Sequence, residues 1–469
     1  MKLASAQGRW VVAGAVLGSG AVFLEGTVVN VALPAIARDL HLGIAGLQWV
    51  VNAYLLTLSA LMLLGGALGD RYSRAGVFGI GAFSFSAASL ASAFAPTVQM
   101  LVVFRLLQGV AGALLVPNSL AMLEAAFEGE ERGAAIGQWA AWSAVSTAIG
   151  PLVGGWLVDA HSWRWVFAAV APFGIMAALI AWRHVDTARG SQSEGHIDWL
   201  GGVIVTLALA SLVGGLTAGP EHGFATPLIG GAIMAGVALL VLFLVVEART
   251  RDPLLPLGVF ESRQFSGANI TTLFVYAPLS ALLLLLMLQL QNVLGYSALR
   301  AGAAFLPVNA IMLAISPAAG RLSHRIGARR PMAIGALLAA IGMVLFTRLS
   351  PGSTYVSGVI PAVLVFGVGL SIFVAPLTSA VLAAVPQDQV GVASAVNNAA
   401  ARLAGLLAVA AIPLAAGLSG STALQRDDLA RGFVRGMWIC AGLCLLGSVT
   451  SWLTISDERP RAQDDSLRA

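Results

Sequence analysis

Residues 66–74 read GALGDRYSR, and residues 320–330 read GRLSHRIGARR. Both segments fit the pattern G-x-L-x-x-R followed by further arginine, and each one follows a long apolar run. Eight apolar runs separate the two copies, whereas two adjoining six-helix halves would place them six runs apart. The repeat therefore predicts two similar halves with two additional helices inserted between them.

The chain around these two segments is too apolar for a water-soluble protein. Of its 469 residues, 58% are hydrophobic and only 10% are charged, and the mean hydropathy is +0.87. Soluble domains carry roughly 25% charged residues, and a helix that crosses a bilayer needs roughly 20 apolar residues. We therefore expect an all-α polytopic membrane protein in direct contact with the lipid bilayer.

Fourteen apolar runs are long enough to cross a membrane. We expect spans at 10–31, 48–69, 76–95, 98–124, 133–157, 163–182, 199–218, 226–246, 266–288, 299–318, 331–348, 356–385, 391–416 and 434–455. The predicted domains are an N-terminal six-helix half (1–183), two inserted helices with flanking cytoplasmic loops (184–263), a C-terminal six-helix half (264–456) and a cytoplasmic tail (457–469).

The basic residues of the short loops predict the orientation of the chain. One face has seventeen of them: Lys2, Arg9, Arg71, Arg74, Arg132, Arg183, Arg189, Arg249, Arg251, Arg263, Arg321, Arg325, Arg329, Arg330, Arg459, Arg461 and Arg468. The other face has seven: Arg38, Arg164, Arg300, Arg348, Arg426, Arg431 and Arg435. The richer face is cytoplasmic by the positive-inside rule. We expect both termini in the cytoplasm, a plasma (inner) membrane location, and a first span that is retained and not cleaved as a signal peptide.

Composition also excludes several kinds of function. The only lysine, Lys2, is followed by Leu3, so no phosphate-cradling Gly-rich loop with Lys-Ser/Thr exists and nucleotide hydrolysis by that route is excluded. The histidines all lie between apolar runs, and Cys440 and Cys444 lie one helical turn apart as two small apolar side chains. The arginines form no stripe that would bind nucleic acid. We expect no cofactor, no metal site and no enzymatic activity.

Several further motifs occur at defined places in the expected spans. Residues 24–34 read LEGTVVNVALP in the first span, and residues 105–113 read RLLQGVAGA in the fourth. In the fifth span, Gly137 is followed by GPLVGG at 150–155. Together with the loop at 66–74, they resemble the major facilitator superfamily, and within it the fourteen-helix drug:proton antiporters. The resemblance covers nearly the whole chain.

The chain departs from the family patterns at four positions. Glu25 stands where the family usually has Asp, Ser73 where the loop has Gly, Ala75 where it has a basic residue, and Ser146 where the motif of the fifth span has Gly. The resemblance implies a secondary transporter, in which the motif of the fifth span accompanies export more than uptake.

Two opposite charges lie at membrane depth, where a charge is costly unless it is paired or faces water. At about 1.5 Å per residue, Glu25 is expected about 9 Å below the external end of its span and Arg105 about 10.5 Å below the external end of the fourth. We predict that they pair. The pair is either purely structural or a proton-coupling or cation-binding pair.

Two groups of residues are candidates for conformational change. The loop residues Gly66, Asp70, Arg71 and Arg74 form either a solvated loop or a conformational latch, in which Asp70 pairs with Arg132 or accepts from a helix N-terminus. Gly137, Gly150, Pro151, Gly154 and Gly155 form either a tight helix contact or a hinge or seal for alternating access, because small residues let helix backbones approach closely and proline permits bending.

The candidates for the substrate cavity combine polar and aromatic side chains in the spans. Aromatic rings stack on aromatic or cationic ligands, although packing in the core or at the lipid interface is the simpler interpretation for any one of them. No acidic partner for Arg402 is evident from the sequence. The candidates are Asn30, Trp49, Tyr54, Gln108, Phe274, Tyr276, Phe373, Asn397, Asn398 and Arg402.

Together with these patterns, the resemblance implies a monomeric transporter that exports amphipathic, often cationic drugs or toxic compounds in exchange for protons. The alternative is a dedicated exporter of one endogenous metabolite, such as an antibiotic, a lipid precursor or a siderophore, on the same fold. A polytopic membrane enzyme would need clustered acids or histidines at one membrane face, and Asp427 and Asp428 have no such companions.

Overall fold

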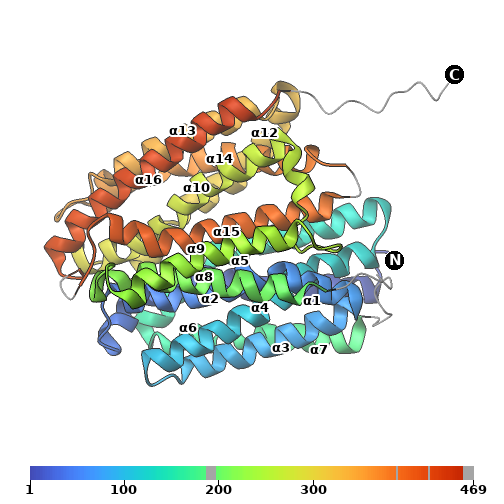
Figure 1. Cartoon of the computed structure of the whole chain (residues 1–469), viewed down its shortest axis with the longest axis horizontal. Helices are drawn as coiled ribbons and strands as arrows, with labels where there is room; N and C mark the ends of the chain where they lie inside the picture. Colours follow the sequence, from blue (N-terminus) through green and yellow to red (C-terminus); the bar gives the residue numbers. More distant parts are fainter. Residues whose placement is uncertain (186–196, 387–388, 421–422, 458–469) are drawn as a thin grey trace. The chain divides into compact units, whose positions relative to one another are not determined.

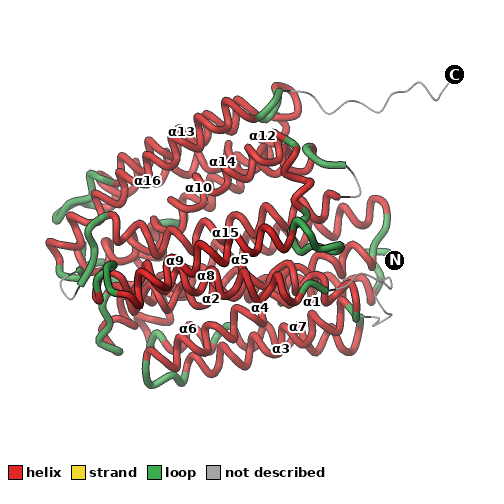
Figure 2. Tube along the Cα trace, viewed as in Figure 1, coloured by secondary structure: helices red, strands yellow, loops and turns green. Residues whose placement is uncertain are grey.

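The computed structural model describes residues 1–185, 197–386, 389–420 and 423–457. All regular secondary structure within these residues is helical (Figure 2). Fourteen helices there are long and apolar enough to cross a membrane. The predicted fold class and number of spans are thereby confirmed. Four arginines of the orientation count (Arg189, Arg459, Arg461 and Arg468) and the tail from residue 458 lie outside the described residues.

Sixteen α-helices make up the described chain (Figure 1). They are α1 (Ala6–Asp39), α2 (Ile44–Arg71), α3 (Arg74–Ala93), α4 (Val98–Ala126), α5 (Gly129–Ala160), α6 (Arg164–Ala168), α7 (Ala171–His184), α8 (Trp199–His222), α9 (Pro227–Glu247), α10 (Arg263–Leu288), α11 (Ala298–Ala304), α12 (Leu306–Ile326), α13 (Arg329–Phe346), α14 (Ile360–Ala383), α15 (Val390–Ala415) and α16 (Arg426–Thr454). Short 3₁₀ or π turns are η1 (Leu257–Glu261), η2 (Gln289–Val293) and η3 (Tyr355–Val359).

Local sequence explains where several helices begin. The side chains of Ser5, Ser73, Thr97 and Asp198 each accept a hydrogen bond from a backbone N–H in the first turn of α1, α3, α4 and α8. Such caps satisfy amide groups that have no partner inside the helix. Ser73, which departs from the family pattern, is therefore the N-cap of α3.

Proline explains why some spans consist of two helical pieces. The sixth span divides into α6 and α7, and the tenth into α11 and α12, and a proline occupies the first turn of α7 and of α12. Proline has no backbone N–H and is favoured in the first turn of a helix, so α7 and α12 begin as new helices at these prolines.

The expected external end of the first span is wrong. Helix α1 continues through Pro34 to Asp39, whereas hydropathy placed the end at residue 31. Arg38 and Asp39 lower the local hydropathy, but the backbone remains helical beyond the apolar stretch. Glu25 therefore lies near the middle of α1, about 21 Å from Asp39 at about 1.5 Å per residue.

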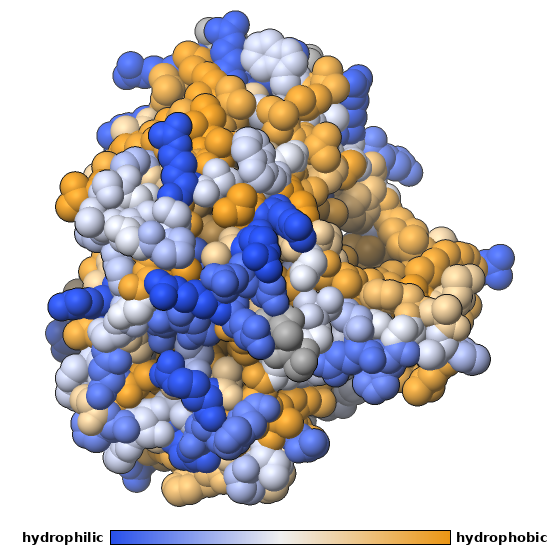
Figure 3. All heavy atoms as spheres, turned by 90° about the vertical axis from the view of Figure 1, so that its left-hand side faces the viewer, coloured by the Kyte–Doolittle hydropathy of each residue, from blue (hydrophilic) through white to orange (hydrophobic). Residues whose placement is uncertain are grey.

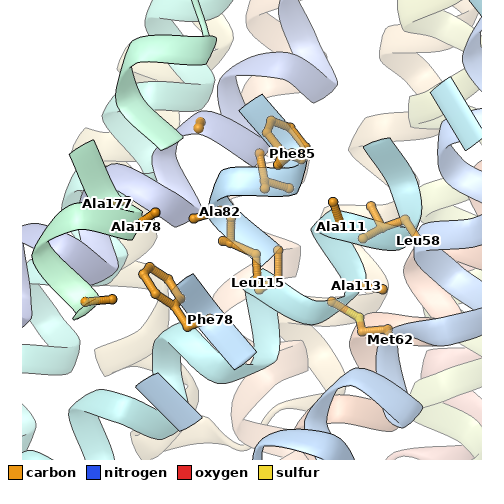
Figure 4. Close-up of a cluster of buried hydrophobic side chains, with 14 of the residues drawn as sticks. Leu58, Met62, Phe78, Ala82, Phe85, Ala111, Ala113, Leu115, Ala177 and Ala178 are labelled. Carbon is orange, nitrogen blue, oxygen red and sulfur yellow. The ribbon is translucent and has the colours of Figure 1, made fainter. Parts of the chain in front are cut away.

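The first helices form a tightly packed bundle in which α2 and α3 both contact α4, and α1 contacts α5 and α7. Phe78, Phe85, Leu58 and Leu115 are fully buried there, with small alanines of α3, α4 and α7 between them (Figure 4). Large rings from α3 fill the space that these alanines leave. The arrangement agrees with the general rule that small residues bring membrane helices close together.

Glycine makes the contact between α2 and α4 especially close. A Cβ atom on Gly65 would lie 2.1 Å from the backbone oxygen of Ala113, and one on Gly109 would lie 2.4 Å from that of Tyr54. The side-chain amide of Asn118 donates to the backbone oxygen of Gly65 at 2.8 Å. Larger residues at these glycines would separate the two helices.

The chain folds into two compact units. Unit 1 comprises Met1–Pro256, Leu283–Ala303 and Val409–Gly432, and unit 2 comprises Leu257–Leu282, Ala304–Ala408 and Phe433–Ala469. Helices α10 and α15 each contribute to both units. In unit 2, α14 packs against α12 and α13.

The inserted helices α8 and α9 pack against each other, and α8 also contacts α2. Only 17% of the apolar stretch of α9 is buried, and Leu228 and Met234 are largely exposed. Such a helix fits a lipid-facing position, since large apolar surfaces are rare on soluble monomers. On the face that Figure 3 shows, hydrophilic side chains gather in the middle and lower part, beside hydrophobic ones.

Candidate functional site

Glu25 of α1 and Arg105 of α4 form the predicted ion pair. The Arg105 Nη1 atom lies 2.6 Å from Glu25 Oε1, and both side chains are buried, with 2% and 0% of their surface exposed. The predicted contact is therefore confirmed. Although α1 is longer than expected, Glu25 and Arg105 lie at the same level of the helix bundle, because their side chains are in direct contact.

Four further groups contact Arg105. Nη1 also donates to Gln108 Oε1 at 2.6 Å, and Nε donates to the backbone oxygen of Val50 at 3.1 Å. The guanidinium lies over the ring of Tyr54, 4.4 Å from its centroid, and 5.7 Å from that of Phe167. A ring face attracts a cation. The Arg105 side chain is thus fixed by contacts that do not depend on Glu25.

This arrangement can couple proton binding to helix contacts. Burial disfavours the charged form of a carboxyl group, and a neighbouring arginine favours it. Protonation of Glu25 removes the charge attraction between α1 and α4, while Val50, Gln108 and Tyr54 still hold Arg105. A single proton therefore changes how α1 is attached to α4.

The predicted latch has a different partner from the one expected. Asp70 Oδ1 pairs with Arg74 Nη2 at 2.7 Å, and Arg74 Nη1 donates to the backbone oxygen of Ala121 at 3.2 Å. Arg132 instead donates to the backbone oxygen of Phe127 at 3.0 Å. The expected Asp70–Arg132 pair is therefore wrong. Arg74 begins α3 only four residues after Asp70, so the short connection between α2 and α3 already brings a partner close to Asp70.

The latch therefore links the ends of three helices, because Arg74 contacts both Asp70 near the end of α2 and Ala121 near the end of α4. The Asp70 side chain is half exposed. Gly66 lies in ordinary contact with Pro117, and Arg71 is exposed at the last residue of α2.

The glycines of α5 contact two different helices. A Cβ on Gly150 would lie 2.2 Å from Thr27 Oγ1, and one on Gly154 would lie 2.4 Å from Val28 Cγ2, both on α1. A Cβ on Gly155 would lie 2.5 Å from the Cα of Leu299 on α11. Gly137 has open space around it.

The contact between α5 and α11 includes hydrogen bonds that the sequence did not indicate. The carboxylate of Asp159 accepts from the backbone N–H of Ala298 at 3.0 Å and of Leu299 at 2.9 Å. A Cβ on Gly302 would lie 2.1 Å from the backbone oxygen of Pro151. Helix α5 therefore packs between α1 and α11 through small residues and ends in a carboxylate that caps α11.

Two glutamines make similar long-range contacts and were also missed. Gln48 of α2 donates to the backbone oxygens of Val409 and Ala410 at 2.7 and 3.1 Å, and Gln291 donates to that of Val31 at 2.9 Å. A glutamine near one end of an apolar run is the only signal in the sequence for these contacts. All these contacts lie within unit 1.

The aromatic and amide candidates lie in several different environments. Trp49 is near Gly214 of α8, Phe274 is near Gly447 of α16, and Phe373 is fully buried where Gly335 of α13 meets α14. The proximity of Trp49 to an inserted helix was not foreseen. Tyr276 is partly buried.

Asn397 is the centre of a polar cluster in unit 2. Its amide donates to Asn269 Oδ1 at 3.1 Å and to Thr272 Oγ1 at 2.8 Å. Asn30 and Asn398 donate within their own helices, to the backbone oxygens of Gly26 and Ser394. Arg402 is partly buried on the same helix as Asn397.

The model of the Major Facilitator Superfamily matches residues 15–409. The chain belongs to the Major Facilitator Superfamily. This superfamily member is therefore a multi-pass membrane protein of a family that transports small molecules. The resemblance inferred from the motifs is confirmed.

Three relatives of this superfamily member are resistance proteins. The puromycin resistance protein of Streptomyces alboniger is 36% identical over 95% of this chain and 90% of its own length. The tetracenomycin C resistance and export protein of Streptomyces glaucescens is 32% identical over 83% and 72%. The methylenomycin A resistance protein of Bacillus subtilis (strain 168) is 33% identical over 82% and 83%.

Solved structures share the fold of this superfamily member. An inward-facing, unoccupied bacterial homologue of the human lysosomal transporter Spinster has a TM-score of 0.70 at 16% identity, covering 96% of this chain and 97% of that one. A D-xylose-proton symporter has a TM-score of 0.66 at 16% identity, covering 97% and 98%.

Proposed function

We propose that the protein exports amphipathic or cationic compounds across the plasma (inner) membrane in exchange for protons. The observation that carries the proposal is the buried contact of Glu25 with Arg105, reinforced by Gln108. The names of the relatives, which refer to resistance and export, support the outward direction.

In this proposal, Glu25 is the proton-coupling residue and Arg105 controls its charge. Burial disfavours the ionised carboxylate of Glu25, whereas the neighbouring Arg105 guanidinium favours it, so the charge of Glu25 depends on what lies beside it. A cationic substrate near Glu25 would favour the ionised form and displace the proton. Substrate and proton then compete, which is what exchange requires.

The proposed conformational change involves the two predicted halves, residues 1–183 and 264–456. The contacts of Gly155 and Asp159 with α11 join these halves, because α5 belongs to the first and α11 to the second. We assign Gly137, Gly150, Pro151, Gly154 and Gly155 to the hinge, and the loop around Asp70 to the latch. Asn397 and Arg402 belong to the proposed substrate cavity with the other candidates.

The same proposal includes both termini in the cytoplasm, a monomeric transporter, and no enzymatic activity or cofactor. The orientation follows from the excess of arginine on one face. Among the described residues, no three His, Cys, Asp or Glu side chains are grouped to hold a metal ion.

A dedicated exporter of one endogenous compound is the second candidate. It is favoured by the relatives, three of which are named for resistance to a single antibiotic: puromycin, tetracenomycin C or methylenomycin A. Both candidates share the fold and the buried pair, and they differ only in the breadth of substrates.

Efflux assays in a host that lacks its own pumps test both candidates. The panel combines cationic dyes with these three antibiotics, each with and without an uncoupler. Export of several unrelated cations that stops with the uncoupler supports the first candidate. Export of one antibiotic alone supports the second, and uncoupler-insensitive efflux of every compound contradicts proton exchange.

A further inference from the structure

Two carboxyl groups meet at one end of the inserted helix pair, away from the Glu25–Arg105 site. Asp198 is the N-cap of α8, and Glu247 is the last residue of α9. Glu247 is only 2% exposed. A Cβ on Gly201 would lie 2.4 Å from Asp198 Oδ2 and 2.6 Å from Glu247 Oε1, so these two oxygens are close to each other.

Each carboxyl group uses its other oxygen to hold a backbone N–H. Asp198 Oδ1 accepts from Gly201 at 2.8 Å, and Glu247 Oε2 accepts from Leu255 at 2.8 Å. The facing oxygens, Asp198 Oδ2 and Glu247 Oε1, are buried and have no hydrogen-bond donor among the described residues. Two hydrogen-bond acceptors, Asp198 Oδ2 and Glu247 Oε1, therefore face each other in a site with little access to solvent.

No basic side chain forms an ion pair with either group in the described residues. Among the described residues, the charged ones on the adjoining elements are Asp70 and Arg71 at the end of α2, and Arg249, Arg251 and Asp252 in the segment after α9. The charged group that acts on Glu247 is Asp198. Two like charges this close cannot both be ionised without a large cost.

We propose that Asp198 and Glu247 share one proton and thereby form a second proton-binding site. With one proton between them, Oδ2 and Oε1 become donor and acceptor of a hydrogen bond, and neither oxygen is left without a partner. The shared proton joins the start of α8 to the end of α9, and Glu247 holds the segment 248–256 through its hydrogen bond with the backbone N–H of Leu255. Loss of the proton drives the carboxylates apart and releases this segment.

The location suggests what the site controls. Gly202, one residue beyond Gly201, lies near Leu64 of α2 and Leu254 of the segment, so the site adjoins the end of α2 that carries the latch. The segment leads from α9 to α10, where the C-terminal half begins. Proton binding to Asp198 and Glu247 therefore determines how firmly the segment 248–256, which leads to the C-terminal half, is held against α2 and α8.

Amide replacements separate a shared proton from a purely structural contact. In Glu247→Gln, the amide oxygen still accepts from Leu255 while the amide nitrogen donates to Asp198, so the variant imitates the protonated pair at every pH. Asp198→Asn does the same from the other side and retains the N-cap. Glu261→Gln, at an exposed acid of η1, is the matched control.

Limited trypsin digestion of the full-length protein in detergent measures release of the segment, because Arg249 and Arg251 are exposed cleavage sites within it. In the wild type and Glu261→Gln, we expect cleavage there to rise about tenfold from neutral to alkaline pH, as a charged-group hydrogen bond is lost. In Glu247→Gln and Asp198→Asn, cleavage at alkaline pH should remain at the level that the wild type shows at neutral pH. A peptide substrate corrects every rate for the pH dependence of trypsin itself.

A second measurement detects the proton itself. Infrared difference spectra at neutral pH, recorded in the Glu25→Gln background, should show a protonated carboxyl band that disappears with Glu247→Gln. Identical digestion profiles in wild type and Glu247→Gln, or a band unaffected by that change, overturn the proposal. Release of the segment at neutral pH in both amide variants overturns it too, because it would indicate a bound cation. Neither assay depends on transport.

Discussion

Gly155 of α5 is the position where an added methyl group meets backbone atoms that cannot rotate away. Its Cβ would lie 2.5 Å from the Cα of Leu299 and 2.6 Å from the backbone oxygen of Ala298. Carbon atoms in contact are normally about 3.5–4.0 Å apart, so α5 and α11 must separate by about 1 Å in Gly155→Ala. Overpacking of this kind costs about 1–3 kcal/mol.

If α5 and α11 are in contact in only one state of the transport cycle, this cost disfavours that state by about 5-fold to 150-fold. We therefore expect Gly155→Ala to reach the membrane but to transport several-fold more slowly, with a lower melting temperature in detergent. The assay is initial efflux of a cationic dye from cells with matched protein levels, together with the melting temperature of purified protein.

Gly137→Ala is the matched control, because it adds the same methyl group to the same helix with nothing within 4 Å. Alanine is favoured over glycine inside a helix by about 1 kcal/mol, so this variant should be at least as stable as the wild type, and its turnover measures the hinge role of Gly137 separately from the α5–α11 clash. Equal turnover and equal melting temperatures for the two variants would refute the proposed role of the α5–α11 contact.

Three further predictions concern the latch, the α11 cap and the orientation. Asp70→Asn should slow turnover with little effect on substrate affinity or stability, since an exposed ion pair contributes about 0–1 kcal/mol; unchanged efflux would reduce the loop to a topology signal. Asp159→Ala, which removes both N–H acceptors at α11, should lower stability by about 0.5–2 kcal/mol, measured by thermal melting, and Asp159→Asn should lose less. An impermeant thiol reagent on intact cells should label a single cysteine at exposed Ser297 but not at Ser193 or Ser466; strong labelling at Ser466 would overturn the even number of spans.

The sequence predicted the fold because membrane helices have a strong and simple signal. Fourteen apolar runs became fourteen candidate spans, and the pairing of Glu25 with Arg105 followed from the cost of a charge in lipid. Hydropathy does not detect where helicity ends, however, so the expected first span stopped at residue 31 whereas α1 continues to Asp39. Partners in loops also could not be predicted, because local geometry joined Asp70 to Arg74.

The contacts that were missed depend on tertiary placement alone. Asp159 and Gln48 are single polar residues near helix ends, and nothing in their neighbourhood in the sequence indicates the backbone groups that they contact. Asp198 and Glu247 are far apart in the chain and meet only because α8 and α9 form an antiparallel hairpin. Pairing across a hairpin requires the register of two helices, which composition does not specify.

Glu25 is the most direct test of proton exchange. Glu25→Gln retains the shape of the side chain and can still accept from Arg105, but it cannot change charge. We expect this variant to lose uncoupler-sensitive efflux of a monovalent cationic dye and substrate-induced proton release from purified protein, while Glu25→Asp keeps part of both. If Glu25→Gln still exports the dye uphill and still releases protons when substrate binds, the coupling residue lies elsewhere and Glu25 is only a structural partner of Arg105.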